Sequence, residues 1–410
     1  MAAHVTRGER AAGPLSLFTD SQFVRLWAIG GLVGVMRWLE ILVIGIYAFQ
    51  VSGSPFVVAA MLVARTAPMV LFGTVIGAIV EDMDRRRVQI GACTLITLAA
   101  VTSAAAAAAD IMSLPLLAGV AFLIGLGWST DFPVRRTLVG DAVGPERLGN
   151  AMLFESATNS ATRMIGPLIG GVTYQVLGLE GAYAIAAVVY GLTIIFALGL
   201  APPQPSRPAG RRESLLARLK AGFAYARCNN VITGVFVITV ILNLFGFAYV
   251  AIIPVWAVES FQADPIFVGL LASAEGGGAF LGSVTLAFWA RPAHFQRLFL
   301  IGAVVFVGGL LIASKLSLYG VALLVLFGAG IGIAAFGAMQ STLVLRESAP
   351  EFRSRVMGVL VACIGIAPLG VLNIGLIAEL TSAGTAIALS SGLGLTLIAL
   401  VTWRLPGIWR

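Results

Sequence analysis

Apolar segments of about 20 residues recur along almost the whole chain, separated by short polar connections. A helix of about 20 residues crosses the ~30 Å hydrocarbon layer of a bilayer. The sequence is 59% hydrophobic and 11% charged, with a mean hydropathy of +0.98, which is typical of integral membrane proteins. The pattern predicts an all-α membrane protein with twelve transmembrane helices, at 22–49, 55–80, 88–110, 114–138, 148–178, 181–201, 230–258, 265–290, 298–315, 318–345, 356–380 and 384–404.

The basic residues predict the orientation of these helices. Twelve spans place both termini on one side, and of the 26 Lys and Arg only Lys315 falls in a connection on the other side, while three lie inside spans. Since basic loops stay in the cytoplasm, we expect a multi-pass protein of the cytoplasmic (inner) membrane with both termini cytoplasmic. The net charge of +7 follows from these loops, and no patch mixing basic and aromatic residues predicts nucleic-acid binding.

Cysteine and histidine are sparse. The three cysteines (Cys93, Cys228 and Cys363) are far apart, and His4 and His294 lie in separate predicted loops. These spacings match no disulfide framework, and we expect no metal and no cofactor. The sequence also lacks an ATP-binding motif, so any driving force is an ion gradient or the gradient of the substrate itself.

The two halves of the chain repeat each other at an offset of 205 residues. The offset aligns Gly125 and Gly127 with Gly330 and Gly332, and likewise Gly77 with Gly282, Arg86 with Arg291, Pro145 and Glu146 with Pro350 and Glu351, and Met152 with Met357. Parallel repeats of this kind place a substrate site between the halves near the middle of the membrane. We therefore divide the chain into a cytoplasmic segment (1–21), a six-helix bundle (22–201), a cytoplasmic linker (202–229), a second six-helix bundle (230–404) and a tail (405–410).

The linker contains an amphipathic pattern, RESLLARLKAGF, with leucines and Phe223 on one face. We expect this helix to lie on the inner membrane surface between the two halves.

One stretch, from Gly140 to Gly171, combines charge and small residues. It begins as a predicted charged loop and continues into a span where Glu155, Asn159 and Arg163 form one stripe at i, i+4 and i+8. The span then carries Gly166, Pro167, Gly170 and Gly171, which predict close helix packing and a bend.

Three stretches resemble the major facilitator superfamily. GAIVEDMDRRR (77–87) resembles its signature loop, and RMIGPLIGG (163–171) resembles the signature of its exporters and antiporters. PERLGNAM (145–152) and PEFRSRVMG (350–358) resemble the branch that contains the enterobactin exporter and macrolide efflux proteins. The resemblance implies a major facilitator fold of two six-helix pseudo-repeats. It also implies a secondary active transporter that exports a small, siderophore- or drug-like organic molecule by alternating access and proton antiport.

Charged residues of the cytoplasmic loops predict a gate between the halves. Acids would bind helix N-termini and arginines would bind carboxylates or helix C-termini when the cytoplasmic side is closed. The alternative explanation is a tight turn with positive-inside arginines. The gate candidates are Gly77, Glu81, Asp82, Asp84, Arg85, Arg86, Glu146, Arg147, Glu351, Arg353 and Arg355.

Charges inside the spans are the strongest functional candidates, because each costs about 2.5–3.5 kcal/mol at a helix centre unless it is paired or hydrated. Arg37 and Glu40 are spaced i, i+3 and can pair on one helix. The carboxyl groups of Glu40, Glu155, Glu275 and Asp131 are candidates for proton coupling. The substrate or cavity candidates are Arg37, Arg65, Asn159, Arg163, Asn243, Trp256, Gln340 and Asn373. Ion pairs that only join helices are the structural alternative.

The chain is thus predicted to be a monomeric secondary transporter whose partners are the lipid bilayer, a small-molecule substrate and protons. An uncoupled facilitator or importer is the alternative function. A non-transporting receptor or a membrane enzyme on a transporter fold is more remote, since no nucleophile–base or metal-ligand set is present.

Overall fold

The computed structural model describes residues 14–201, 215–289, 291–405, 407 and 409, without the side chains of 14–15, 74–82, 145 and 215–218. Most of the predicted cytoplasmic segment, the first half of the linker and part of the tail therefore lie outside the described residues.

The N-terminal half is a helical bundle. It consists of a short 3₁₀ helix η1 (Pro14–Thr19), α1 (Ser21–Ser52), α2 (Pro55–Asp82), α3 (Arg85–Ala108) and α4 (Leu114–Leu198). The 85-residue α4 leaves helical geometry at Gly144 (φ 73°, ψ 171°) and Gly178 (φ 69°, ψ −168°), so it is three helices joined by single-residue turns. Glycine adopts these positive φ angles without the steric cost of a Cβ.

The C-terminal half begins with α5 (Leu215–Arg227). Its remaining elements are α6 (Asn230–Ile241), a π-helical turn η2 (Leu242–Gly246), η3 (Phe247–Ile252), α7 (Ile253–Phe261), α8 (Pro265–Trp289), η4 (Pro292–His294), α9 (Phe295–Ala313), α10 (Tyr319–Glu347), α11 (Arg353–Ile364), α12 (Ala367–Leu380) and α13 (Ala383–Arg404). Elements α6 to α7 and the pair α11 and α12 each form one crossing with an irregular middle.

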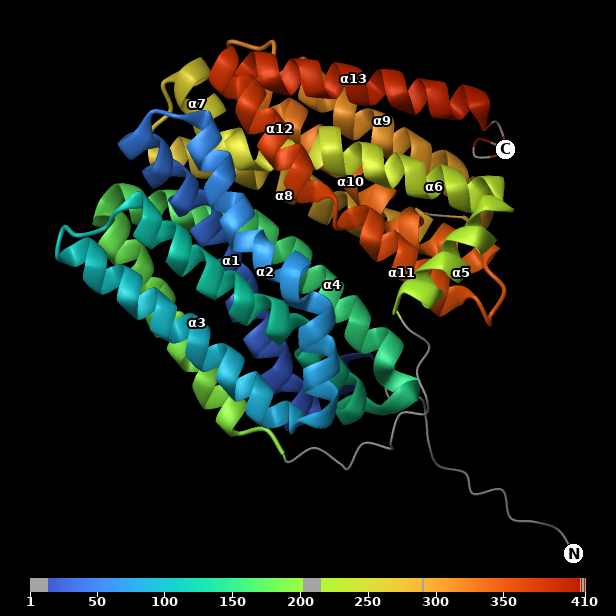
Figure 1. The fold of residues 1–410 in the computed structure, drawn as a ribbon, viewed down its shortest axis with the longest axis horizontal. Coiled ribbons are helices and arrows are strands. Elements are labelled where there is room, and N and C mark those ends of the chain that lie inside the picture. The colour runs from blue at the N-terminus through green and yellow to red at the C-terminus, as the bar shows by residue number, and fades with distance from the viewer. Residues whose placement is uncertain (1–13, 202–214, 290, 406, 408, 410) are drawn as a thin grey trace, which may run out of the picture.

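Twelve crossings follow from these bounds. Eleven described helices are long and apolar enough to cross a membrane, and one of them, Glu146–Leu198, holds two crossings because the chain reverses at Gly178. The prediction of twelve membrane helices in an all-α fold is confirmed. Figure 1 shows them as two bundles, α1–α4 and α6–α13, packed against each other.

The two faces of the molecule need names. We call the terminal face the side where η1 and the end of α13 lie, and the opposite face the side that holds Gly53, Gly178 and Gln262. In Figure 1 the terminal face is toward the right and the opposite face toward the upper left.

The internal repeat appears as equivalent helix contacts. A Cβ at Gly125 would lie 1.9 Å from the Arg65 carbonyl oxygen of α2, and a Cβ at Gly330 would lie 2.0 Å from the Glu275 carbonyl oxygen of α8. Since Gly125 and Gly330 are repeat partners, Arg65 and Glu275 occupy equivalent places in the two halves. Glycine is required at both positions because the helix backbones touch.

One local prediction in the stretch from Gly140 to Gly171 is wrong. The expected loop is helical except at Gly144. The backbone from Gly166 to Gly171 keeps helical φ and ψ angles, and a bend of the helix axis there stays a prediction. The small residues allow close packing on α1 and α8.

The amphipathic helix α5 docks on the C-terminal half instead of lying between the halves. A Cβ at Gly222 would lie 2.5 Å from the Arg355 carbonyl oxygen, and the Tyr225 ring stacks on Phe352 with centroids 4.4 Å apart. Phe223 on α5 stays 54% exposed. The helix therefore attaches to the N-terminal end of α11.

Candidate functional site

The two halves are in backbone contact from the middle of the membrane to the opposite face. A Cβ at Gly171 of α4 would lie 2.3 Å from the Pro265 carbonyl oxygen of α8, and a Cβ at Gly269 would lie 2.5 Å from the Pro167 carbonyl oxygen. Gly166 and Gly170 instead pack on α1, next to Trp38 and Leu39. The glycine–proline stretch is thus wedged between α1 of its own half and α8 of the other half.

Helix N-termini complete the closure at the opposite face. Ser54 Oγ and the Phe56 amide, at the start of α2, donate to Glu379 Oε2 of α12 at 2.7 and 3.2 Å. The Ile266 amide, at the start of α8, donates to Gln175 Oε1 of α4 at 3.0 Å. Each half therefore caps a helix N-terminus of the other half.

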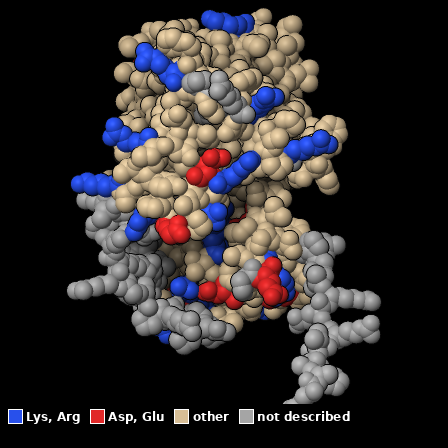
Figure 2. Space-filling model, turned by 90° about the vertical axis from the view of Figure 1, so that its right-hand side faces the viewer, with Lys and Arg blue, Asp and Glu red and all other residues tan. Residues whose placement is uncertain are grey.

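The terminal face is open in comparison. Figure 2 shows acidic and basic side chains spread over this face, several of them around a hollow between the halves.

The gate residues other than Arg355 make their described contacts within their own half. Arg85 pairs with Asp141 at 2.8 Å, Arg86 donates to the Leu198 carbonyl oxygen at 2.7 Å, and Asp84 caps α3. Arg147 lies 3.7 Å from Asp20, Arg353 donates to the Leu345 carbonyl oxygen, the Arg355 guanidinium lies near the Phe352 ring, and Glu146 and Glu351 are exposed. Gly77 has no side chain, and the side chains of Glu81 and Asp82 lie outside the described residues. The gate stays a prediction for the conformation in which this face is closed.

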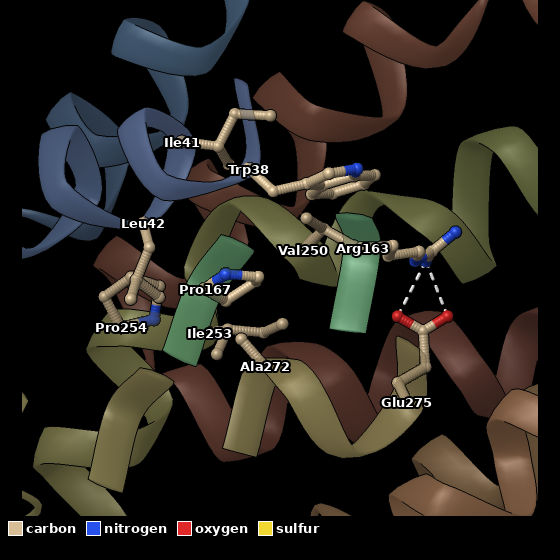
Figure 3. Close-up of a pocket in the computed structure, with 10 residues that line it drawn as sticks. All are labelled: Trp38, Ile41, Leu42, Arg163, Pro167, Val250, Ile253, Pro254, Ala272 and Glu275. Atoms are coloured by element: carbon tan, nitrogen blue, oxygen red, sulfur yellow. Dashed lines mark hydrogen bonds and ion pairs between the residues drawn. The ribbon is translucent and has the colours of Figure 1, made fainter. Parts of the chain in front are cut away.

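At the centre, an ion pair joins the halves. Arg163 Nη2 of α4 lies 2.5 and 2.6 Å from the two carboxylate oxygens of Glu275 in α8 (Figure 3). Glu275 is 2% exposed and Arg163 is 17% exposed, so the pair is at the edge of water. Trp38, Leu42, Val250 and Ile253 are among the apolar residues that line the small cavity beside the pair.

A second ion pair is inside the N-terminal half. Glu40 of α1 accepts from Arg65 Nη1 of α2 and from the Tyr190 hydroxyl, both at 2.9 Å. Glu40 is 1% exposed and Arg65 is 5% exposed. The predicted pairing of Arg37 with Glu40 is wrong. Helix α2 packs beside α1 so that Arg65, and not Arg37, contacts the Glu40 carboxylate.

A third cluster joins α3 to two segments of α4. Arg135 donates to Glu155 at 2.6 Å and to Asp131 at 3.4 Å, and Gln89 donates to Asp131 at 2.5 Å. All four side chains are buried. Asp131 and Glu155 share one arginine within a single half.

Arg37 differs from the other arginines of the membrane interior. Its guanidinium lies 4.0 Å from the ring centroid of Trp128 and 5.3 Å from that of Trp38, and no ion pair is recorded for it in the described structure. It lines a cavity of the N-terminal half together with Arg136, Thr158 and Asn159.

The candidates of the C-terminal half are mostly structural. Asn243 in η2 donates to the Thr239 carbonyl oxygen of α6 at 2.8 Å, a contact within one crossing. Gln340 of α10 donates to Thr239 Oγ1 at 2.6 Å and so joins α10 to α6. Trp256 is 1% exposed and packs on Phe261, away from the residues that line the central cavity. Asn373 is exposed on the face of α12 that carries the exposed leucines 369, 376 and 380.

Sequence reasoning missed the neutral and peripheral partners of these charges. Tyr190, Gln89 and Trp128 have no spacing or charge pattern that marks them, because their partners lie on other helices. Only Glu379 had a signal, as one of several acids near span ends on the opposite side.

Known proteins resemble this chain over most of its length. A family model described as transmembrane secretion effector matches residues 12–408. Macrolide efflux protein A of Streptococcus pyogenes is 24% identical over 371 residues, which is 87% of this chain and 89% of the relative. Enterobactin exporter EntS of Escherichia coli O127:H6 is 27% identical over 400 residues, which is 93% of this chain and 89% of the relative.

Solved structures agree on the fold. A mutant of the nucleoside transporter NupG matches with a TM-score of 0.75 at 14% identity, covering 95% of this chain and 100% of that chain. The matched family and relatives are secondary transporters and not enzymes. Because the family model spans nearly the whole sequence, this chain belongs to the transmembrane secretion effector family of major facilitator superfamily transporters.

Proposed function

We propose that this transporter exports a small organic molecule across the cytoplasmic membrane by alternating access, in exchange for protons that bind Glu275. The names of the relatives, an efflux protein and an exporter, support the direction. The excess of basic residues on the terminal face supports a cytoplasmic location for that face. The hollow there would then admit substrate from the cytoplasm.

The ion pair between Arg163 and Glu275 is the observation that carries the proton-coupling proposal. Alternating access moves one half against the other, so contacts within a half travel unchanged and only contacts between halves form and break. Within the described residues, Arg163–Glu275 is the ion pair that joins the halves. Glu40 and Glu155 are paired inside the N-terminal half, so the movement leaves their partners in place.

The pair suggests an order of events. With the opposite face closed, Arg163 forms the ion pair with Glu275. When the opposite face opens, Glu275 loses Arg163, substrate leaves and a proton from that side neutralises the carboxylate. Closing the opposite face again brings Arg163 back and releases the proton toward the terminal face. One proton thus enters for each molecule exported.

Transport in proteoliposomes with an imposed pH gradient tests the proposal, with a macrolide and enterobactin as trial substrates. Glu275→Gln is expected to abolish gradient-driven accumulation but to retain exchange of substrate at equal pH. Glu40→Gln is the matched control, because its ion pair lies within one half. The double variant Glu275→Gln, Arg163→Gln removes both charges and guards against a loss caused by an unpaired arginine.

The outcomes are distinct. Gradient-driven accumulation by Glu275→Gln equal to that of the native chain would exclude Glu275 as the coupling group. Flux that ignores the gradient in the native chain would identify an uncoupled facilitator instead.

A further inference from the structure

The acids of the membrane interior are all occupied. Glu40 binds Arg65 at 2.9 Å, Glu275 binds Arg163 at 2.5 Å, and Glu155 and Asp131 share Arg135. A cationic substrate would first have to break one of these buried pairs, which exposes an uncompensated charge. The described interior therefore offers no free carboxylate to a cation.

Two arginines show the reverse situation. Arg37 lies over the Trp128 ring at 4.0 Å and Arg136 lies over the Phe132 ring at 4.3 Å, and neither forms an ion pair within the described structure. The Glu155 carboxylate, which lines the same cavity, acts on Arg136 but binds Arg135. The charged groups that act on Arg37 most strongly are Arg65 and Arg163, which are also positive. The cavity around Arg37 thus holds three arginines, Arg37, Arg135 and Arg136, against one carboxylate, Glu155, so positive charge is in excess there.

The surroundings of Arg37 form a built cavity. Helix α1 contributes Arg37 and the two small residues Gly30 and Gly34, and α4 contributes Trp128, Arg136 and Asn159. A Cβ at Gly34 would lie 3.0 Å from the Thr162 side chain, so a larger residue there would narrow the cavity. Arg136 and Asn159 are exposed, which places the entrance on their side.

An aromatic ring holds a guanidinium by its face and leaves the N–H groups at the edge free to donate. A guanidinium in this state binds carboxylate with two parallel charge-assisted hydrogen bonds. Inside a membrane protein an unpaired charge is costly, so a bound carboxylate stabilises such a guanidinium more than water does.

We propose that the transported molecule is an organic anion whose acidic group binds Arg37, with Arg136 at the entrance. Its apolar body extends past Trp38 into the cavity between the halves, beside Ile41 and Val250. This inference rests on the proposed function only in that the hollow is the substrate route, and it names the class of substrate.

Binding of three probes of equal size to the purified protein in detergent tests the inference: 2-naphthoate, 2-naphthalenemethanol and 2-naphthylmethylamine. Quenching of tryptophan fluorescence reports the affinity without a gradient, so failure of proton coupling and failure of anion binding are separately visible. We expect the acid to bind about tenfold or more tightly than the alcohol and the amine, as one charge-assisted contact requires. Arg37→Gln should remove this preference.

Arg404→Gln is the matched control, because Arg404 is exposed and also lies near an aromatic ring, that of Trp403, at 5.3 Å. Its affinity for 2-naphthoate should equal that of the native chain. A thermal melt without probe is the second readout. Arg37→Gln should melt at the same or a higher temperature, since no acid loses a partner, whereas Arg65→Gln should melt lower.

Three results would overturn the inference: an amine or alcohol that binds as tightly as the acid, no saturable binding of the acid, or an Arg37→Gln protein that keeps the preference. A clear loss of stability in Arg37→Gln would also count against it, because it would show that Arg37 serves the fold.

Discussion

Gly171→Ala is predicted to open the opposite face. The new Cβ would lie 2.3 Å from the Pro265 carbonyl oxygen, whereas ordinary contact begins at 3.4 Å, so α4 and α8 must separate by about 1.1 Å. Overpacking of this kind costs about 1–3 kcal/mol, and here the cost falls only on the conformation in which the halves touch. The ratio of open to closed molecules should therefore rise by about 5- to 150-fold.

Spin labels on the opposite face can measure this change by double electron–electron resonance. Ile111→Cys and Lys315→Cys place one exposed label on each half. The native cysteines at 93, 228 and 363 are replaced first. The distance distribution should gain a longer component in Gly171→Ala.

Gly166→Ala is the matched control in the same helix. Its Cβ would lie 2.5 Å from Trp38 Cβ and 2.8 Å from the Val35 carbonyl oxygen, both in the same half. The strain is then present in both conformations, so Gly166→Ala should lower the melting temperature and leave the label distances unchanged. Equal distance changes in the two variants, or none in Gly171→Ala, would refute the assignment of Gly171 to the moving interface.

Two further substitutions test the opposite-face caps and the buried cluster. Glu379→Ala removes the carboxylate that accepts from Ser54. Since a helix cap contributes about 0.5–2 kcal/mol, the population with the longer label distance should rise a few-fold. An unchanged distance distribution would contradict this. Arg135→Gln leaves Glu155 and Asp131 buried without a cation and should lower the free energy of unfolding by about 3–5 kcal/mol, measured by chemical denaturation in detergent. Arg85 pairs with Asp141, which is 50% exposed, so Arg85→Gln should lower the free energy of unfolding by less than about 1 kcal/mol. Equal losses of stability in the two variants would show that burial does not determine the strength of these ion pairs.

The crossings could be predicted because each is a local property of length and hydropathy. The second span was expected at 55–80 and is Pro55–Asp82, and the last was expected at 384–404 and is Ala383–Arg404. The same local reasoning missed the turn at Gly144, where a single residue replaces the expected loop. A single glycine with positive φ can reverse the chain without the polar residues that usually mark a loop in a sequence.

The charges of the membrane interior could be found in the sequence, but their partners could not. Arg37 and Glu40 share a helix and satisfy the i, i+3 rule, yet Glu40 binds Arg65 and Tyr190 from two other helices. Arg163 and Glu275 are 112 residues apart, and only the packing of the halves brings them together. Helical spacing predicts contacts within one helix, whereas the partner of a buried charge often lies on a neighbouring helix.

The internal repeat explains why one ion pair crosses between the halves. Arg65 and Glu275 occupy equivalent places, since repeat-related glycines contact their carbonyl oxygens. The N-terminal half balances Arg65 with its own Glu40, but Glu275 is balanced by Arg163 from the other half. When the halves separate in the proposed cycle, Glu275 loses its cation and no described arginine of its own half stands in. A proton is the smallest replacement for that cation. The same separation that opens the route for the substrate therefore also exposes Glu275 to protons, which couples the two movements in the proposed cycle.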